Sequence, residues 1–294
     1  MKVLVTGASG QLGQDVILQL REDGHTAIGT DINDEFLPMD ITDIDKVHNT
    51  LHSINPDAVI HCAAWTAVDS AEDLENQKKV FDINHKGTEN IATVCKELDI
   101  KLLYTSTDYV FNGEGTTPWD ADCDNYAPVN IYGKSKLHGE LAVSSTLTKF
   151  FIVRIQWVYG AGGKNFIKTM LNVGKRYECV KVVNDQIGSP TYTKDLARLF
   201  SEMIVTDKYG YYHARNEGNF VSWYDLTCKL YKLLDYSTKI VPVTTEEYGL
   251  SNARRPKNSR LDTSKLAQYG FTPLPDWEDA VERYIKELEN RNLL

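Results

Sequence analysis

The stretch KVLVTGASGQLG, residues 2–13, decides the fold. Its first five residues form a short β-branched run, which predicts a buried strand. A glycine-rich turn follows at once, and QDVILQLREDG (residues 14–24) then carries apolar residues at helical spacing up to a glycine stop. Strand, glycine turn and helix in this order are typical of the phosphate-binding unit of dinucleotide-binding proteins.

The glycines of this turn have separate physical roles. Gly7 permits a tight turn, Gly10 lets the backbone approach a pyrophosphate, and Gly13 allows close packing of the helix, whose N-terminal end favours a diphosphate. A second predicted strand, TAIGTD, ends in Asp31, where an acid accepts a hydrogen bond from an adenosine ribose. A generic α/β turn with a capping aspartate is the alternative, but the combination favours dinucleotide binding. Asp31 would repel a 2′-phosphate, which favours NADH and leaves NADPH open.

The rest of the chain continues the alternation of strands and helices. Further predicted elements are buried strands over residues 57–64, 101–107 and 149–160, and a helix from about Leu74 to Leu98. This pattern predicts an α/β fold with a doubly wound (Rossmann) parallel sheet, whose ligands bind beyond the carboxyl ends of the strands. The rhythm becomes less regular near residue 157. We therefore expect a dinucleotide-binding domain over residues 1–156, to which some later segments return, and a smaller, interwoven substrate-binding lobe mainly over residues 157–294.

Composition excludes several classes of function. The net charge of −9 argues against broad nucleic-acid binding, which needs a basic face. No apolar run approaches the roughly 20 residues of a membrane helix. The apolar run in the opening MKVLVTGASG is too short for a signal peptide. The five cysteines are scattered without a CxxC pair and are expected to be reduced thiols. We expect a cytoplasmic protein that binds a small molecule, not nucleic acid or a membrane.

The stretch NIYGKSKLHGE, residues 130–140, carries candidate chemistry. Tyr132 and Lys136 stand four positions apart, a spacing that places both on one helix face. When a carbonyl accepts a hydride, negative charge develops on its oxygen, and a tyrosine can donate a proton there. A lysine cation about 5 Å from the phenol would lower the phenol's pKa by about two units. A hydroxyl at a neighbouring strand end, Thr107 or Ser106, would fix the carbonyl oxygen beside the phenol.

The same spacing occurs a second time, so it is not specific by itself. Tyr177 and Lys181 also stand four apart, but they lead into the apolar run CVKVV and follow no hydroxyl-bearing strand end. We therefore assign the proton-handling pair to Tyr132 and Lys136. The alternative for either pair is two polar residues that share a helix face.

Six further motifs extend the pattern over nearly the whole chain: CAAWTAVD, STDYVFNG, YGKSKLHGE, NFIKTM, DQIGSPT and RRPKNSRLD. With TGxxGxxG and YxxxK, they resemble the extended short-chain dehydrogenase/reductase family and, within it, the dTDP-4-dehydrorhamnose reductases. The resemblance implies an NADPH- or NADH-dependent oxidoreductase. Its reaction would reduce the C4 keto group of dTDP-4-dehydro-6-deoxy-L-mannose (dTDP-4-dehydrorhamnose) to dTDP-L-rhamnose for a cell-surface polysaccharide, with Tyr132 as the proton donor.

The resemblance also implies roles for individual residues. The catalytic trio would be Thr107, Tyr132 and Lys136, with Lys136 also holding the nicotinamide ribose. The cofactor-binding residues would be Gly7, Gly10, Gln11, Leu12, Gly13, Asp31, Asp40, Ile41, Ala63, Ala64, Trp65, Tyr132 and Lys136. The substrate-binding residues would be Thr107, Asp108, Trp157, Asn165 and Arg255. The guanidinium fork of Arg255 suits a diphosphate.

The chain departs from the family pattern at several positions. Ile155 and Gln156 stand where a threonine and a small hydroxyl residue are expected, and Trp65 stands where histidine or tyrosine is more usual. A reductase or epimerase of another nucleotide sugar therefore stays open. A non-catalytic regulatory subunit like that of methionine adenosyltransferase is a further alternative. The presence of Thr107, Tyr132 and Lys136 argues against it. Related dehydratases carry TDE after the strand, whereas here Asp108 precedes Tyr109, so reduction is favoured over dehydration.

No metal ligand is assigned from the sequence. DADCD (residues 120–124) has the alternating acids of a calcium loop, but Asn125 and Ile131 replace the required glycine and glutamate. The seven histidines are each expected to be surface or core residues. Some relatives are thought to bind Mg²⁺ through acids at a dimer contact. Those acids do not map onto this chain, so the sequence does not support Mg²⁺, and a homodimer is an expectation from the resemblance alone.

Overall fold

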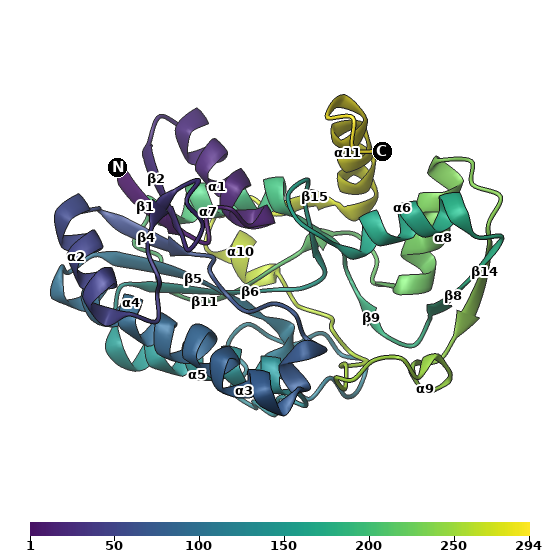
Figure 1. The fold of residues 1–294 in the computed structure, drawn as a ribbon, viewed down its shortest axis with the longest axis horizontal. Coiled ribbons are helices and arrows are strands. Elements are labelled where there is room, and N and C mark those ends of the chain that lie inside the picture. Colours follow the sequence, from purple (N-terminus) through teal and green to yellow (C-terminus); the bar gives the residue numbers. More distant parts are fainter.

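The computed structural model describes residues 1–294, and its centre is a seven-stranded sheet (Figure 1). In spatial order the strands are β11 (Gly210–Ala214), β6 (Phe150–Ile155), β5 (Lys101–Thr107), β4 (Ala58–His61), β1 (Lys2–Thr6), β2 (Thr26–Asp31) and β3 (Leu37–Pro38). Every neighbouring pair in this sheet is parallel. The predicted doubly wound parallel sheet is confirmed.

Helices cover both faces of the sheet (Figure 1). One face packs against α1 (Gln11–Glu22), α7 (Thr193–Ile204) and α10 (Ser264–Gln268), and the other against α2 (Ile44–Ile54), α4 (Thr88–Glu97) and α5 (Ile131–Thr146). Successive side chains of β1 serve opposite cores: Val3 and Val5 pack under α1, whereas Leu4 packs toward α2 and α4. A strand buried on both faces needs a nearly continuous apolar run, which explains KVLV. None of the helices combines the length and the apolar character that crossing a bilayer requires.

The second half of the chain builds a smaller lobe with its own apolar core (Figure 1). Its elements are β7 (Val158–Tyr159), α6 (Phe166–Arg176), β8 (Cys179–Val183), β9 (Ile187–Gly188), β10 (Thr191–Tyr192), β12 (Asn216–Glu217), β13 (Val221–Ser222), α8 (Trp223–Leu233), β14 (Lys239–Val243), α9 (Thr245–Tyr248), β15 (Leu274–Asp276) and α11 (Trp277–Asn290). Between them, α7 and β11 return to the large sheet and complete its layers.

Two predicted elements are divided in the structure. The helix predicted from Leu74 to Leu98 consists of α3 (Leu74–Phe81), a π-helical turn η2 (Asp82–Gly87) and α4, preceded by a short 3₁₀ turn η1 (Ser70–Glu72). The strand predicted over residues 149–160 ends at Ile155, because Trp157 takes a left-handed φ of 45°. Beyond it, β7 pairs with β10 in the smaller lobe. The chain therefore changes lobe at Trp157.

A fully buried ion pair joins α5 to the sheet. Arg154 of β6 donates from Nε and Nη2 to the carboxylate of Glu140, at 2.9 and 2.8 Å, and both side chains are wholly buried. Its remaining donors reach the carbonyl of Ala121 at 3.2 Å and the hydroxyl of Tyr126 at 2.9 Å. Because neither charge has access to water, each depends on the other. This pair fixes the helix that carries Tyr132 and Lys136.

Replacing Glu140 by alanine is expected to lower the free energy of unfolding by about 3–5 kcal/mol, because the guanidinium is left buried without its counter-charge. Urea denaturation measures this change. The matched control is Glu89→Ala, which breaks the exposed Lys86–Glu89 pair and is expected to cost less than about 1 kcal/mol. A loss at Glu140 no larger than the control's would show that the buried pair does not hold α5 in place.

Candidate active site

A cleft of about 940 Å³ opens at the carboxyl ends of the central strands. Its walls include the turn after β1, the ends of β2, β5 and β6, the segment after β4, and side chains from α6 and α8 of the smaller lobe. The strand order reverses direction between β1 and β4, and doubly wound sheets bind ligands at this switch point. The sheet therefore places its site where the sequence predicts it.

The turn between β1 and α1 brings three backbone segments into contact. Gly7 has φ +68°, and a Cβ at this residue would lie 2.6 Å from the backbone nitrogen of Ala63. A Cβ on Gly13 would lie 2.2 Å from the carbonyl oxygen of Gly7. Helix α1 begins at Gln11 with Gly10 as its N-cap, so no side chain caps its first N–H groups. These free donors and the positive end of the helix dipole fit a diphosphate.

The end of β2 supplies the acid expected beside an adenosine ribose. Asp31 lines the cleft, and its carboxylate accepts hydrogen bonds from the backbone N–H groups of Ser9 at 3.0 Å and Ile32 at 2.8 Å. The acid is thereby held against the glycine turn. Asp40 and Ile41 also line the cleft, and the Ile41 carbonyl accepts from Asn90 at 2.9 Å. The glycine turn, the uncapped helix and Asp31 together fit an adenine dinucleotide.

Helix α5 places the predicted proton-handling pair in the cleft. Asn130 caps the helix by accepting from the N–H of Gly133 at 2.7 Å, so Tyr132 lies in the first turn and Lys136 one turn later. Lys136 Nζ donates to the carbonyl of Thr105 at 2.7 Å and lies 4.1 Å from the ring centroid of Tyr104. Thr107, the last residue of β5, lines the same cleft. The structure thus brings Thr107, Tyr132 and Lys136 together.

The expected lowering of the phenol's pKa is wrong for this structure. Burial raises the pKa of Tyr132, and although Thr107 acts in the opposite direction, its effect is smaller. Burial also lowers the pKa of Lys136 to about 7, against the attraction of Glu140 and Cys62. Attraction between a lysine and a phenolate lowers the phenol's pKa, but the loss of water around both groups opposes it and dominates here.

Several buried polar atoms of the cleft have no hydrogen-bond partner within the protein. These atoms are Ser106 Oγ, Asp108 Oδ2 and the amide nitrogen of Gln156. Burial raises the pKa of Asp108 to about 7. Unpartnered buried polar groups are rare because they cost free energy, and their concentration here suits a polar ligand.

Two stacked tryptophans form the wall on the side of the smaller lobe. The ring centroids of Trp157 and Trp223 lie 3.6 Å apart, and the rings are 15° from parallel. The ring centroid of Phe166 lies 4.4 Å from that of Trp223. Trp157 is held in the left-handed region, a strained conformation that clusters at functional sites. Trp223 is not predictable from the sequence, because no local pattern links the start of α8 to Trp157.

Arg255 reaches the cleft from the C-terminal part of the chain. Its Nη2 pairs with Asp69 at 2.6 Å, and its Nη1 donates to the Tyr109 hydroxyl at 3.4 Å. The Tyr109 ring meets that of Tyr132 edge-on, with 5.7 Å between centroids. This chain of contacts joins the loop that carries Arg255 to the predicted proton donor.

Two predicted ligand-binding residues do not line the cleft. Asn165 instead caps α6, accepting from the N–H of Lys168 at 3.0 Å and donating to the carbonyl of Gly160 at 2.9 Å. Trp65 donates from its backbone N–H to Asn84 at 2.8 Å and from its indole to the carbonyl of Ala67 at 3.1 Å. All the other predicted site residues line the cleft.

The two rejected motifs have structural explanations. Tyr177 is exposed at the end of α6 and Lys181 lies in β8, so this pair does not share a helix. In the 120–124 loop, Asp120 accepts from the N–H of Asp122 at 2.7 Å, and Asp122 pairs with Lys265. The loop is held by this backbone turn and by the ion pair to Lys265 of α10.

Fold and cleft define this protein as a Rossmann oxidoreductase of the extended short-chain type, with a dinucleotide turn beside a Tyr–Lys pair. A family model described as "RmlD substrate binding domain" matches residues 1–290. The chain belongs to this family, that of the dTDP-4-dehydrorhamnose reductases.

Individual relatives match over nearly the whole chain. The chain is 39% identical to the spore coat polysaccharide biosynthesis protein SpsK of Bacillus subtilis, over 97% of each chain. It is 36% identical to dTDP-4-dehydrorhamnose reductase of Escherichia coli K12, over 98% of each. The crystal structure of dTDP-4-dehydrorhamnose reductase from Bacillus anthracis in complex with NADP superposes with a TM-score of 0.91 at 40% identity, covering 98% of this chain and 100% of that one.

A Gly13→Ala variant is expected to bind NADPH or NADH about ten- to a hundredfold more weakly, because the added Cβ would overlap the Gly7 carbonyl and displace the turn. Titration of nicotinamide fluorescence measures the affinity. Leu18→Ala, on the exposed side of the same helix, is the control. Unchanged affinity in a folded Gly13→Ala protein would contradict the assignment of the turn.

Lys136 should impose a pH dependence on stability. Its folded pKa of about 7 lies below the ordinary 10.5, so between these values the unfolded state binds more protons and stability rises with pH. Relative to Lys136→Met, the wild type should gain about 2 kcal/mol in free energy of unfolding between about pH 7 and pH 9. Urea titrations at the two pH values measure the difference. A difference that does not change with pH would contradict the lowered pKa.

Proposed function

We propose that this protein reduces the C4 keto group of dTDP-4-dehydrorhamnose to dTDP-L-rhamnose with NADPH or NADH. The observation that supports this most directly is a single cleft that joins the glycine turn to Tyr132, Thr107 and the unpartnered polar atoms. Family membership supplies the class of substrate. In this proposal residues 1–156 mainly hold the cofactor and residues 157–294 mainly hold the sugar nucleotide.

The cofactor would be held by the residues that fit a dinucleotide. The backbone of the turn at Gly7, Gly10 and Gly13 receives the diphosphate, Asp31 accepts from the adenosine ribose, and Lys136 contacts the nicotinamide ribose. When bound, the cofactor supplies the hydride. The charge of Asp31 disfavours the 2′-phosphate that distinguishes NADPH from NADH. The preference between these two cofactors therefore depends on the groups around this carboxylate.

Tyr132 donates the proton that completes the reduction. Its raised pKa keeps the phenol protonated at neutral pH, the form required to protonate the developing alkoxide. Thr107 orients the carbonyl oxygen beside the phenol. Lys136 has a pKa of about 7. In its charged form it stabilises the tyrosinate that remains after proton transfer. The carbonyl carbon gains a hydride and its oxygen gains a proton, which gives the alcohol.

The remaining cleft residues position the sugar nucleotide. Arg255 supplies the positive charge for the diphosphate, and Asp69 holds its side chain in place. Trp157 and Trp223 offer an aromatic wall beside the sugar. Gln156 presents an unpartnered amide nitrogen where the family pattern has a small hydroxyl, so it bears on which sugar is accepted.

The function is tested by following NADH and, separately, NADPH oxidation with dTDP-4-dehydrorhamnose generated in the same cuvette. Oxidation that depends on this sugar supports the proposal, and the two rates rank the cofactors. Oxidation with another 4-keto nucleotide sugar but not with this one would replace the substrate and keep the reaction. Cofactor binding without cofactor oxidation in the presence of any such sugar would instead favour a binding subunit.

Tyr132→Phe is expected to lower turnover by about 10²- to 10⁴-fold, because the proton donor is lost, while cofactor affinity stays near that of the wild type. The steady-state rate of cofactor oxidation measures turnover, and a fluorescence titration measures cofactor affinity. Tyr177→Phe, which changes the second YxxxK tyrosine, is the matched control and should leave both unchanged. Turnover of Tyr132→Phe within a few-fold of this control would overturn the assignment of the proton donor.

A further inference from the structure

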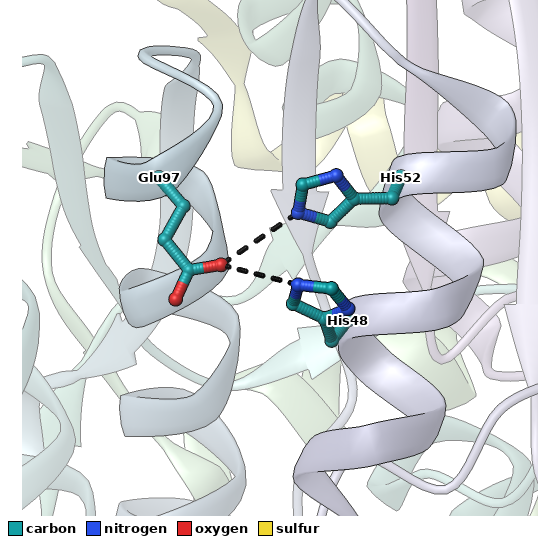
Figure 2. Close-up of side chains that lie close together, drawn as sticks. All are labelled: His48, His52 and Glu97. Atoms are coloured by element: carbon teal, nitrogen blue, oxygen red, sulfur yellow. Dashed lines mark ion pairs between the residues drawn. The ribbon is translucent and has the colours of Figure 1, made fainter.

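Two histidines and a glutamate, all exposed, lie close together on two neighbouring helices (Figure 2). His48 and His52 project from α2, and Glu97 is the last residue of α4. The two histidines were expected to be surface or core residues, yet they stand four positions apart, which places them on one helix face. The fold then adds the carboxylate from the neighbouring helix.

The distances in this cluster match a shared ion better than direct hydrogen bonds. Nε2 of His48 and Nε2 of His52 each lie 3.6 Å from the same oxygen, Oε2 of Glu97 (Figure 2). A separation of 3.6 Å is too long for a hydrogen bond. Two ligands on a tetrahedral ion with bonds of about 2.0–2.2 Å lie about 3.4 Å apart. The separation of each histidine nitrogen from the carboxylate oxygen is therefore within a few tenths of an ångström of that between two ligands of one ion, and all three ligand atoms lie within 4.8 Å of one another.

The electrostatics of the two helices also favour a cation here. Glu97 ends α4 and His52 lies in the last turn of α2, so both groups stand at the negative ends of helix dipoles. A carboxylate in that position is unfavourable unless a positive charge lies near it. Both helices end at the edge of the sheet opposite the cleft, because each leads into the start of a parallel strand. An ion at this place would not touch the reacting groups.

We propose that His48, His52 and Glu97 form a binding site for a divalent transition-metal ion of the zinc class. Two imidazoles and one carboxylate are a donor set of zinc proteins, whereas Mg²⁺ and Ca²⁺ prefer oxygen ligands alone. All three side chains are exposed, so water completes the coordination. The bound ion joins α2 to α4 and stabilises the folded state, since the unfolded chain does not hold the three ligands together.

The test is titration of the chelator-treated full-length protein with Zn²⁺ by calorimetry, and with Co²⁺ by visible absorption. The wild type should bind one ion, with an absorption band typical of cobalt in a low-coordinate site, and Zn²⁺ should raise its Tm. His48→Ala and His52→Ala should each weaken binding more than about 100-fold, and Glu97→Gln should weaken it less. His85→Ala is the control, because His85 and His138 form another histidine pair, 5.2 Å between ring centroids, outside this cluster.

The outcomes separate the proposal from its alternatives. One ion bound by the wild type and by His85→Ala, but lost in both cluster histidine variants with unchanged circular dichroism, supports it. No binding by the wild type overturns it. Equal binding by a His48→Ala/His52→Ala double variant also overturns it, because the ion would then lie at thiols or in the cleft. Glu97→Gln removes the carboxylate charge and leaves both histidines in place. It therefore tests the same site if a histidine variant fails to fold.

Discussion

The approach of three backbone segments at the start of α1 is the constraint on which the rest of the site depends. Gly7 lies against the segment after β4, and Gly13 lies against Gly7 itself, so neither position has room for a side chain. This contact fixes α1 over the end of β1 with its first N–H groups directed into the cleft. The order of the strands then places the end of β5, and with it Thr107, on the far side of the same opening.

Burial, rather than pairing of charges, sets the protonation of the groups in this opening. It raises the pKa of Tyr132, brings that of Lys136 down to about 7, and brings that of Asp108 up to about 7. A buried phenol that keeps its proton is suited to donate it when an alkoxide forms, and a nearby ammonium then becomes more stable beside the new negative charge. The same exclusion of water that costs stability thus directs proton transfer toward reduction.

The sequence predicted what depends on local pattern. The limits of β1, β2 and β5 agree with the predicted strands, because each is an apolar run ended by a glycine or a polar residue. It missed what depends on tertiary contact: the break at Trp157, the π-helical turn η2, the stacking of Trp223, and the capping role of Asn165. It also missed the pair His48 and His52, whose spacing was visible but whose third partner comes from another helix.

The division of the chain into two lobes explains why the reaction type is easier to infer than the sugar. The glycine turn and the Tyr–Lys pair are built within the sheet layer, from segments close in sequence to the strands that hold them. The wall that we propose faces the sugar is built from Gln156, Trp157 and Trp223, whose arrangement depends on the strained crossing between lobes. A substitution there changes the shape offered to the sugar without disturbing the sheet. Gln156, whose amide nitrogen has no hydrogen-bond partner in the protein, is therefore the residue of this wall on which we propose that the choice of sugar depends.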